Sequence, residues 1–402
     1  MRTGLPVVLG GAPVVADELP LSRPSIALDP ELTSALDAVL ASGIITKGGR
    51  LAELERQVAA FIGVEHAVAV SSCTTGLMLV LRCLGRTGSV ILPSFTFMAS
   101  GHAALWNGLD PVLADIDPDT FTLAPESAAR MLDEDGAAVM GVHTFGAPCD
   151  ADALTKVANE RGVPLVIDAA PAFGARYPDG TMVGTKGIAE VFSFSPTKPF
   201  TTGEGGLIAT DDADLARRLR IGREYGNPGN FDSLFVGLNG RMPELSAALG
   251  LHNLPHLPRW LERREELAER YRAGLSDLPG IGFQRIPAGA RSTYKDFCLT
   301  VHAADFGLDR DVLAEALGAE RVSTRKYFVP PLHRQTVYRG TAGDAGAVPH
   351  SEALAGRIIT VPLWSAMTDH QVEEVCAVIR RIHEHAGDVA HAVARSAALR
   401  EG

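Results

Sequence analysis

The stretch Glu190-Val-Phe-Ser-Phe-Ser-Pro-Thr-Lys-Pro-Phe-Thr-Thr-Gly-Glu-Gly-Gly206 decides how the rest of the chain is interpreted. It begins as an apolar and aromatic run of strand type, breaks at Pro196, presents Lys198, and ends in a glycine turn before Leu207–Thr210 resumes as a strand. A lysine on a turn between two buried strands lies close to the core, where partial removal from water favours the neutral amine that condenses with aldehydes. The alternative is an ordinary surface lysine, and the other motifs of the chain decide between the two.

Length and composition indicate an ordinary soluble enzyme with more than one core. A chain of 402 residues is long for one simple core, and 46% hydrophobic with 21% charged residues is usual for a globular protein. The formal charge of −11 and the lack of a dense Lys/Arg block argue against nucleic-acid binding. The five cysteines are scattered and lack CxxC or Cys/His spacing, so we expect no disulfide framework, no metal site and a cytoplasmic location. We find no signal peptide and no uninterrupted span of transmembrane length.

Short apolar runs alternate with helical patterns over the first half of the chain. Strands are expected at His66–Val70, Val90–Leu92, Pro111–Asp115, Ala137–Val142, Pro164–Ile167, Val191–Phe194 and Leu207–Thr210. Helices are expected at Leu51–Ile62, Thr75–Leu84, Met98–Trp106, Pro125–Leu132, Asp150–Arg161 and Ala213–Arg223. Seven short and mostly unalternating strands linked by helices predict an α/β fold with a largely parallel sheet that is buried on both faces.

The pattern divides the chain into three parts. Residues 1–27 are rich in Pro and Gly and are predicted to form an extended arm. Residues 28–254 are predicted to form a large α/β domain and residues 255–402 a smaller α+β domain, with the boundary near Leu254–Pro258. The expected elements of the smaller domain are a charged helix at Arg259–Leu275, a strand near Phe297–Val301, and helices at Asp311–Leu317 and Asp369–His383. The last dozen residues read as a frayed helix.

Two motifs follow predicted strands, where an open α/β sheet binds its ligands. In Val70-Ser-Ser-Cys-Thr-Thr-Gly76, small hydroxylated residues at a helix start expose unpaired N–H groups that suit a phosphate, although plain N-capping by Ser72 or Thr74 explains the same residues. In Pro93-Ser-Phe-Thr-Phe-Met-Ala-Ser100, Phe97 is our candidate to stack on a flat ring, with Phe95 as the alternative and core packing as the competing explanation.

Two further motifs complete the set. Asp168 ends the buried strand in Pro164-Leu-Val-Ile-Asp-Ala-Ala-Pro-Ala-Phe-Gly174, where a carboxylate is costly without a cationic partner such as a pyridinium N–H. The alternative is an Asp that caps a turn or pairs with an Arg. Ser193 and Ser195 precede Lys198 and point to the same side of a strand, so at least one of them is placed to bond a phosphate or to support the lysine. The order of phosphate turn, aromatic residue, buried Asp and Lys indicates a pyridoxal 5′-phosphate site.

At these residues the chain resembles the DegT/DnrJ-type sugar aminotransferases, which are pyridoxal-phosphate enzymes of fold type I. The resemblance runs from Gly43 to about Thr368, and its most specific part is Ser-Phe-x-x-Thr-Lys followed by Thr-Thr-Gly-Glu-Gly-Gly. It also includes Gly237-Leu-Asn-Gly-Arg-Met242 and Val361-Pro-Leu363. The resemblance implies a PLP-dependent transferase fold with a mostly parallel seven-stranded sheet in the large domain.

The resemblance also implies roles for matching residues. Lys198 would form the Schiff base and act as acid and base in the proton shift, and Asp168 would bind the pyridine nitrogen. Phe97 would stack on the ring, and Cys73, Thr74 and Ser193 would hold the phosphate. Asn239 corresponds to a residue that reaches the phosphate of the neighbouring subunit, so a homodimer with shared active sites is expected.

Three positions depart from the family pattern. Pro171 stands where members often carry Gln or His near the phenolic oxygen of the cofactor, and a proline cannot donate a hydrogen bond. Cys73 stands where glycine is common, and Ser195 replaces a frequent histidine. None of the three changes affects Lys198 or Asp168. Pro171, however, leaves the phenolic oxygen of the cofactor without this hydrogen-bond donor, which affects the protonation of the cofactor.

The resulting expectation is a ping-pong transamination from glutamate or glutamine to a keto-sugar, most simply a nucleotide-linked one, in amino-sugar biosynthesis. Candidate substrate contacts lie in Thr46–Lys47, Tyr225–Phe231, Arg241 and Tyr327–His333. The alternatives are transamination of a cyclitol ketone or another carbonyl metabolite, and a non-catalytic regulatory protein of the same fold. A dehydratase is disfavoured because that branch of the family replaces the lysine that is present here as Lys198.

Overall fold

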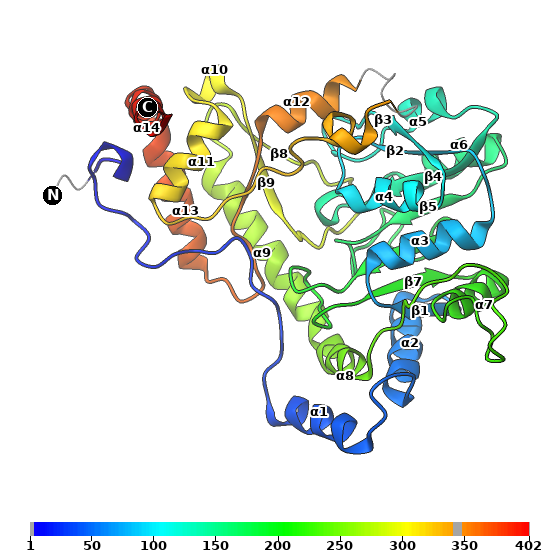
Figure 1. Ribbon diagram of the computed structural model, residues 1–402. Helices are drawn as coiled ribbons and strands as arrows, with labels where there is room; N and C mark the ends of the chain where they lie inside the picture. Colours follow the sequence, from blue (N-terminus) through cyan, green and yellow to red (C-terminus); the bar gives the residue numbers. More distant parts are fainter. Residues whose placement is uncertain (1–3, 341–347, 402) are drawn as a thin grey trace.

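A computed structural model describes residues 4–340 and 348–401, and over these residues the chain forms a seven-stranded and a three-stranded sheet. The first three residues of the predicted arm and residues 341–347 and 402 of the predicted smaller domain lie outside the described residues. Figure 1 shows the larger sheet with its helices on the right, and the smaller sheet beside the upper part of the long helix α9 (Leu257–Leu275).

The larger sheet has the order β1-β7-β6-β5-β4-β2-β3. Its strands are β1 (His66–Val70), β2 (Ser89–Pro93), β3 (Asp110–Ala114), β4 (Gly136–Val142), β5 (Leu165–Asp168), β6 (Ala189–Ser193) and β7 (Gly206–Thr210). All neighbours pair in parallel except β7, which is antiparallel to both β1 and β6. The predicted α/β class and the predicted strands are therefore confirmed, with ends that differ by at most two residues.

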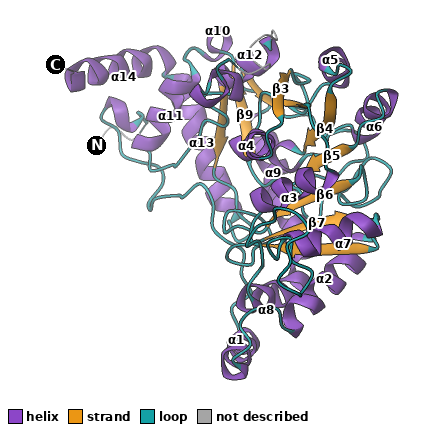
Figure 2. Cartoon of the chain, turned by 45° about the vertical axis from the view of Figure 1, so that its right-hand side comes forward, coloured by secondary structure: helices purple, strands orange, loops and turns teal. Residues whose placement is uncertain are grey.

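Burial on both faces explains why the strands read as continuous apolar runs. Every residue of β2, β5, β6 and β7 is buried, as expected for strands covered by helices on each side. Figure 2 shows the strands between two layers of helices. The helices and short 3₁₀ turns of this part are α1 (Pro30–Ser42), α2 (Gly49–Ile62), α3 (Cys73–Leu84), α4 (Met98–Trp106), α5 (Pro125–Met131), η2 (Thr144–Gly146), α6 (Ala151–Glu160), α7 (Ala213–Gly222) and α8 (Glu244–Asn253).

Side-chain caps determine where several of these helices begin. Asp150 and Asp212 each accept a hydrogen bond from a backbone N–H in the first turn of α6 and α7. Asp29 does the same for α1, with Pro30 at the first helical position. Helix α1 is not among the helices expected from the sequence, of which the first is Leu51–Ile62. Only Leu32 and Val39 of α1 are buried, so its apolar periodicity is weak.

The second part of the chain packs around its own core. Its elements are η3 (Leu254–His256), α9, β8 (Ile281–Phe283), β9 (Phe297–Val301), α10 (Ala303–Phe306), α11 (Arg310–Ala319), η4 (Leu332–Arg334), η5 (Thr336–Tyr338), α12 (Pro349–Arg357), β10 (Ile358–Val361), α13 (Asp369–Glu384) and α14 (Ala386–Glu401). The strands form an antiparallel sheet in the order β10-β9-β8. The sequence analysis found β9 but not the two outer strands.

The amino-terminal arm, which includes η1 (Val7–Leu9), lies against this second core rather than against the large sheet. Val15 and Leu19 are buried there, and Leu19 bridges to Val322. The buried Glu320 accepts hydrogen bonds from the backbone N–H groups of Val7 and Val14. The predicted domain boundary near Leu254–Pro258 stays a prediction.

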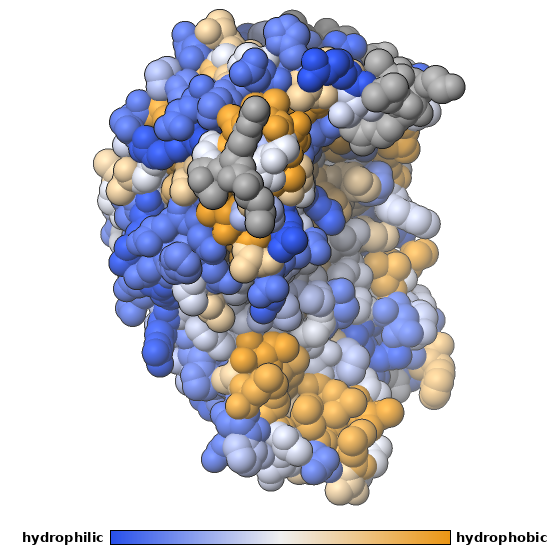
Figure 3. All heavy atoms as spheres, turned by 90° about the vertical axis from the view of Figure 1, so that its left-hand side faces the viewer, coloured by the Kyte–Doolittle hydropathy of each residue, from blue (hydrophilic) through white to orange (hydrophobic). Residues whose placement is uncertain are grey.

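Large apolar side chains are exposed in and next to α1. Leu28 is 84% exposed, and Leu40, Ile44 and Ile45 are each more than half exposed. Figure 3 shows hydrophobic side chains on the lower part of one face, the end of the molecule at which Figure 1 places α1 and α8. Among the described residues, none of the helices combines the length and apolar character needed to span a bilayer.

Candidate active site

The carboxyl ends of β1, β2, β5 and β6 meet at one edge of the large sheet, and β7 begins at that edge because its direction is reversed. Cys73 and Thr74 follow β1, Phe97 follows β2, Asp168 ends β5, and Ser193 ends β6. The predicted site residues therefore come from segments far apart in the sequence but reach the same edge. This is where open α/β sheets bind their ligands.

Lys198 lies in the connection between β6 and β7. The connection is anchored on both sides by the fully buried rings of Phe194 and Phe200, whose centroids are 4.8 Å apart. The backbone N–H of Lys198 donates to Ser195 O at 3.0 Å, and that of Thr202 donates to Phe194 O at 3.0 Å. The lysine is thus held on a short, braced turn next to the core, as the sequence predicted.

The Lys198 amine has an unusual environment. The residue is half-buried, and among the described residues no hydrogen bond or ion pair engages its Nζ. Burial first, and then repulsion from Lys295, lower the pKa of Lys198 to about 8, against weaker attraction by Asp296, Cys73 and Asp168. About a tenth of the amine is therefore neutral and nucleophilic at pH 7, far more than for an ordinary lysine.

Asp168 is 4% exposed and is held by three neighbours. Its Oδ2 accepts from the Ser100 hydroxyl at 2.6 Å, and its Oδ1 accepts from the backbone N–H of Ala170 at 3.1 Å. The Cys73 thiol points at Oδ1 from 3.7 Å, and burial together with Asp168 raises the pKa of that thiol well above its usual value. Cys73 therefore stays protonated. Because none of these neighbours is a cation, the carboxylate is suited to a cationic ligand group.

The turn after β1 presents backbone N–H groups. Ser72 caps α3 by accepting from Thr75 N at 3.1 Å, so the capping alternative considered for this motif is also realised. The N–H groups of Cys73 and Thr74 have no acceptor among the described residues, as expected for the first turn of a helix. A Cβ on Gly206 would lie 2.5 Å from Cys73 N, so only glycine lets β7 approach this turn. These free donors suit a phosphate.

Phe97 and Asn239 are exposed to solvent. Phe97 is 52% exposed, whereas the alternative Phe95 is fully buried in the core. Asn239 precedes Gly240, whose carbonyl accepts from Ser71 N at 2.8 Å next to the phosphate turn. Stacking by Phe97 and contact of Asn239 with a second subunit stay predictions.

A charged pair that the sequence did not predict lies near Lys198. Lys295 is 5% exposed, its Nζ is 2.6 Å from Asp296 Oδ1, and it lies 5.7 Å from the centre of the Tyr327 ring. The two residues directly precede β9 of the small sheet, so their only sequence signal is a polar pair before an apolar strand. Lys295 is the charged group that contributes most to the low pKa of Lys198.

The guanidinium of Arg264 holds the segment that carries this pair. Arg264 lies in α9, is 3% exposed, and donates to the carbonyl oxygens of Thr293, Tyr294, Lys295 and Leu363 at 2.8–3.2 Å. Thr293 in turn donates from Oγ1 to Pro171 O at 2.6 Å. The small sheet is thereby tied to the loop after β5, and Pro171 contributes through its carbonyl rather than through a side-chain donor.

A buried polar cluster surrounds Glu190 in β6, the strand that leads to Lys198. Glu190 in β6 is fully buried and accepts from the Tyr177 hydroxyl at 3.0 Å and lies 3.0 Å from His143 Nε2. The backbone N–H of Cys149 donates to His143 Nδ1 at 3.0 Å, so this nitrogen carries no proton. The ring proton is therefore on Nε2, which donates to the Glu190 carboxyl group.

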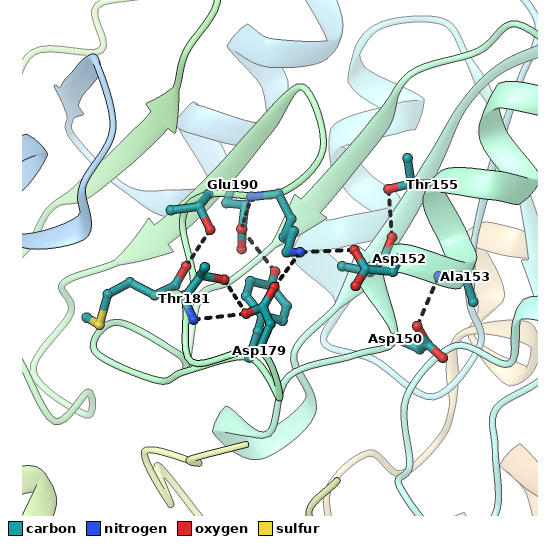
Figure 4. Close-up of polar contacts among 12 residues, drawn as sticks. Asp150, Asp152, Ala153, Thr155, Asp179, Thr181 and Glu190 are labelled. Atoms are coloured by element: carbon teal, nitrogen blue, oxygen red, sulfur yellow. Dashed lines mark hydrogen bonds and ion pairs between the residues drawn. The ribbon is translucent and has the colours of Figure 1, made fainter. Parts of the chain in front are cut away.

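The cluster continues to the surface through Lys186, whose backbone N–H donates to Glu190 Oε1 at 2.8 Å. Its Nζ lies 3.0 Å from Asp152 Oδ1 and 2.9 Å from Asp179 Oδ2. Figure 4 shows the side chains of Asp152, Asp179 and Glu190 in this cluster. These contacts fix the strand that leads to Lys198 and do not reach the sheet edge themselves.

The predicted substrate contacts fall into two groups. Lys47 and Arg241 both pair with Glu224, at 2.5 and 2.9 Å, and the Arg241 guanidinium lies 5.7 Å from the centre of the Tyr225 ring. In the other group, His333 Nδ1 is 2.6 Å from Ser94 Oγ, just after β2. The structure thus brings Lys47, Tyr225 and Arg241 together, while His333 contacts Ser94 and belongs to a different group of residues.

Comparison with known proteins places these features in context. The model of the DegT/DnrJ/EryC1/StrS aminotransferase family matches residues 27–380. A dTDP-3-amino-3,4,6-trideoxy-alpha-D-glucose transaminase from Streptomyces venezuelae is 35% identical over 87% of this chain and 91% of its own. The spore coat polysaccharide biosynthesis protein SpsC of Bacillus subtilis (strain 168) is 33% identical over 90% and 97%. The crystal structure of DesI in the presence of its TDP-sugar product is 38% identical, with a TM-score of 0.90 over 97% of this chain and 98% of the other.

Proposed function

Because this chain belongs to the DegT/DnrJ/EryC1/StrS aminotransferase family, and is thus an aminotransferase, we propose that it uses pyridoxal 5′-phosphate to transfer an amino group from glutamate or glutamine to a nucleotide-linked keto-sugar. The observation that supports the cofactor most directly is the Lys198 amine, which is half-buried, has a lowered pKa and lacks a partner among the described residues. It stands at the sheet edge that also carries Asp168 and the free N–H groups after β1.

The residues at this edge fit the parts of the cofactor. Asp168 would pair with the protonated pyridine nitrogen, the N–H groups of Cys73 and Thr74 with Ser193 would hold the phosphate, and Phe97 would cover one face of the ring. When bound, pyridoxal 5′-phosphate supplies an aldehyde that condenses with amines and a ring that withdraws electrons from the reacting carbon. Asp168 keeps the ring nitrogen protonated, which this electron withdrawal requires.

Lys198 is proposed to act as the general base and general acid of the reaction. A lysine with a pKa of about 8 is neutral often enough to accept a proton at Nζ and acidic enough to return it. Lys295 is paired with Asp296 at 2.6 Å, so its amine is engaged and is not assigned a role as a base. The same Lys198 side chain therefore serves both half-reactions, removal of the amino group from the donor and its delivery to the acceptor.

The nucleotide-sugar class is supported by the relatives whose names include such compounds, among them the dTDP-sugar transaminase and DesI with its TDP-sugar product. The group formed by Lys47, Arg241 and Tyr225 offers two cations and an aromatic face, which suit a diphosphate and a base.

We also propose a homodimer with shared active sites. The exposed apolar residues Leu28, Leu40, Ile44 and Ile45 and the exposed Asn239 beside the phosphate turn support this arrangement. A cytoplasmic location stays a prediction.

The cofactor assignment is tested on the purified protein. It is expected to be yellow, or to turn yellow with pyridoxal 5′-phosphate, and borohydride should fix the cofactor covalently on the peptide that contains Lys198. A Lys198→Ala variant should bind the cofactor without this covalent link. Fixation on another lysine, or a protein that pyridoxal 5′-phosphate cannot colour, would refute the assignment and favour the non-catalytic alternative.

The substrate is tested separately by half-reactions. The pyridoxamine form is incubated with a panel of keto-sugar nucleotides and, in parallel, with cyclitol ketones, and the return of the yellow form is followed by absorbance. Conversion by a nucleotide-linked keto-sugar is expected. Conversion by cyclitol ketones alone would refute the nucleotide-sugar class while leaving the aminotransferase intact.

A further inference from the structure

A cluster of metal-ligating side chains lies far from the sheet edge, where the start of α1 meets the end of α8. Asp29, His252 and His256 each place one ligand atom within 4.8 Å of those of the other two. Figure 1 shows α1 and α8 side by side at the lower end of the molecule. The proposed transamination uses none of these three residues.

A hydrogen bond to one carboxylate oxygen of Asp29 fixes the side chain and leaves the other oxygen available to a ligand. Its Oδ1 accepts from the backbone N–H of Leu32 at 2.9 Å as the cap of α1. Its Oδ2 lies 3.1 Å from His252 Nε2. One oxygen therefore fixes the orientation of the side chain while the other faces the imidazole.

The two histidines are four residues apart on a continuous helical path. His252 lies in α8 and His256 in η3, and Leu254 between them has α-helical backbone angles of φ −56° and ψ −43°. Residues at this spacing lie on the same side of a helix. Their ring centroids are 5.8 Å apart, and the His256 ring stacks on Trp260 at 5.8 Å. Both rings therefore face the region that Asp29 closes.

In contrast to the absence of a metal site expected from the cysteine pattern, we propose that Asp29, His252 and His256 bind one divalent transition-metal ion of the zinc class. Two imidazoles and a carboxylate are typical ligands of Zn²⁺ and also accept Co²⁺, Ni²⁺ or Cu²⁺. Bond lengths near 2.0–2.2 Å in a tetrahedron put ligand atoms about 3.3 Å apart. The Asp29–His252 pair is already close to this separation at 3.1 Å, and the exposed His256 lies within 4.8 Å of both, so it needs to move by at most about 1.5 Å.

Such an ion would join the first helix to the end of α8. Asn253, next to His252, already accepts from Ala27 N at 3.3 Å and donates to Thr201 O at 3.0 Å. The ion would strengthen the same junction, which reaches the connection that carries Lys198. The role is structural, and it does not depend on the proposed function.

The competing explanation is a metal-free clamp. His252 Nε2 lies 3.1 Å from Ala27 O as well as from Asp29 Oδ2, so a protonated Nε2 satisfies both oxygens without an ion. The clamp needs His252 but gives His256 no part, whereas a metal site needs both histidines. Variants of His256 therefore separate the two explanations.

The test uses full-length holoenzyme without an affinity tag, stripped with EDTA and titrated with ZnCl₂ in a calorimeter. We expect one saturable site per chain and a higher melting temperature with Zn²⁺. Asp29→Asn, which keeps a capping oxygen, and His256→Asn are each expected to weaken binding at least about 10-fold to 100-fold, the loss seen even for groups that only support a ligand.

His370→Asn is the matched control, because His370 is an exposed histidine 3.7 Å from Glu374 on another helix. This variant is expected to bind Zn²⁺ like the wild type. The absence of a saturable site would overturn the proposal and favour the metal-free clamp. Equal binding by wild type and His256→Asn would also overturn it, because the ion would then bind without His256. Neither result depends on activity, so the outcome is distinguishable from a failure of the proposed function.

Discussion

Two effects act in the same direction on the Lys198 amine. Removal from water lowers its pKa, and the buried Lys295 lowers it further by like-charge repulsion. The Nζ of Lys295 is itself 2.6 Å from Asp296 Oδ1. The second lysine therefore tunes the first without contacting the reacting atoms in our proposal, and this can be measured.

Replacement of Lys295 should raise the pKa of Lys198. In the wild type, the neutral fraction of Lys198 increases as the pH rises through about 8, so the rate at which apo-protein captures pyridoxal 5′-phosphate should rise in the same window. Lys295→Met removes the repulsion and leaves Asp296 unpaired, and both changes favour the charged amine. We expect the midpoint to move up by about one pH unit, followed by absorbance.

Lys156→Met is the control for this experiment, because Lys156 is exposed on α6. Its midpoint should match the wild type. An unchanged midpoint in Lys295→Met would show that Lys295 does not set the pKa of Lys198.

Asp168→Asn should keep the shape of the site and remove its charge. The amide still has an oxygen that accepts from Ser100, but it cannot stabilise a pyridinium. Loss of one member of a buried charge pair typically costs about 2–5 kcal/mol, so we expect the half-reaction with the amino donor to slow by at least about 30-fold. Ser100→Ala removes one neutral-to-charged hydrogen bond and should have a smaller effect. Equal rates in Asp168→Asn and wild type would refute the role of the charge.

For individual residues, the sequence predicted the site residues that end strands. It did not predict residues that other parts of the chain bring to the site. Asp168 and Ser193 could be predicted because each ends an apolar run, and a run can be read locally. The contacts of Asp168 with Ser100 and Cys73 could not, because they depend on how α3, α4 and β5 pack. Lys295 reaches the neighbourhood of Lys198 only through the docking of the small sheet, for which the sequence has no local signal.

Helix α9 holds two other segments of the chain in place through one buried arginine. Its Arg264 donates to four carbonyl oxygens of two segments of the second part of the chain. The pKa of Arg264 is lowered to about 10 by burial, so the guanidinium is still charged at neutral pH. Hydrogen bonds from a charged donor are stronger than neutral ones, and the planar fork suits several acceptors at once.

Arg264→Leu is expected to lower the free energy of unfolding by roughly 3 kcal/mol or more, because buried carbonyl oxygens are left without a donor. The measurement is the urea midpoint followed by circular dichroism. The neighbouring Arg263 is the matched control, since its ion pairs with Asp369 and Glu266 are partly exposed. Arg263→Leu should cost less than about 1 kcal/mol. Similar losses in both variants would show that Arg264 has no special role.

Helices and strands were predicted correctly where their hydrophobic pattern is clear. The buried parallel strands are unbroken apolar runs, and α13 has strong apolar periodicity after a Thr368 cap. Helix α1 was missed because its face is mostly exposed, although Asp29-Pro30 is a readable start signal. The strand β8 is only three residues long and half-buried, so neither length nor burial marks it.

For the whole molecule, the exposed apolar surface near α1 leads to a prediction about assembly. We expect a particle with a mass near twice 42.5 kDa in sedimentation velocity. The double variant Leu40→Glu with Ile44→Glu places two charges on this surface at positions more than half exposed, so the fold should persist while the dimer dissociates. Lys156→Glu on α6 is the control and should leave the mass unchanged. A monomeric wild type, or a dimer that tolerates the double variant, would refute the assignment of this surface.

The reversed strand β7 also has a consequence for synthesis on the ribosome. Edge strand β1 pairs only with β7, and the register joins His66 to Thr210, about 140 residues later. At about 5–20 residues per second, roughly 7–30 s pass between the emergence of the two strands. During that interval the nascent chain carries an apolar strand with no partner. Chaperone capture or slow translation over this window should therefore affect the yield of folded protein more than the same delay after Thr210.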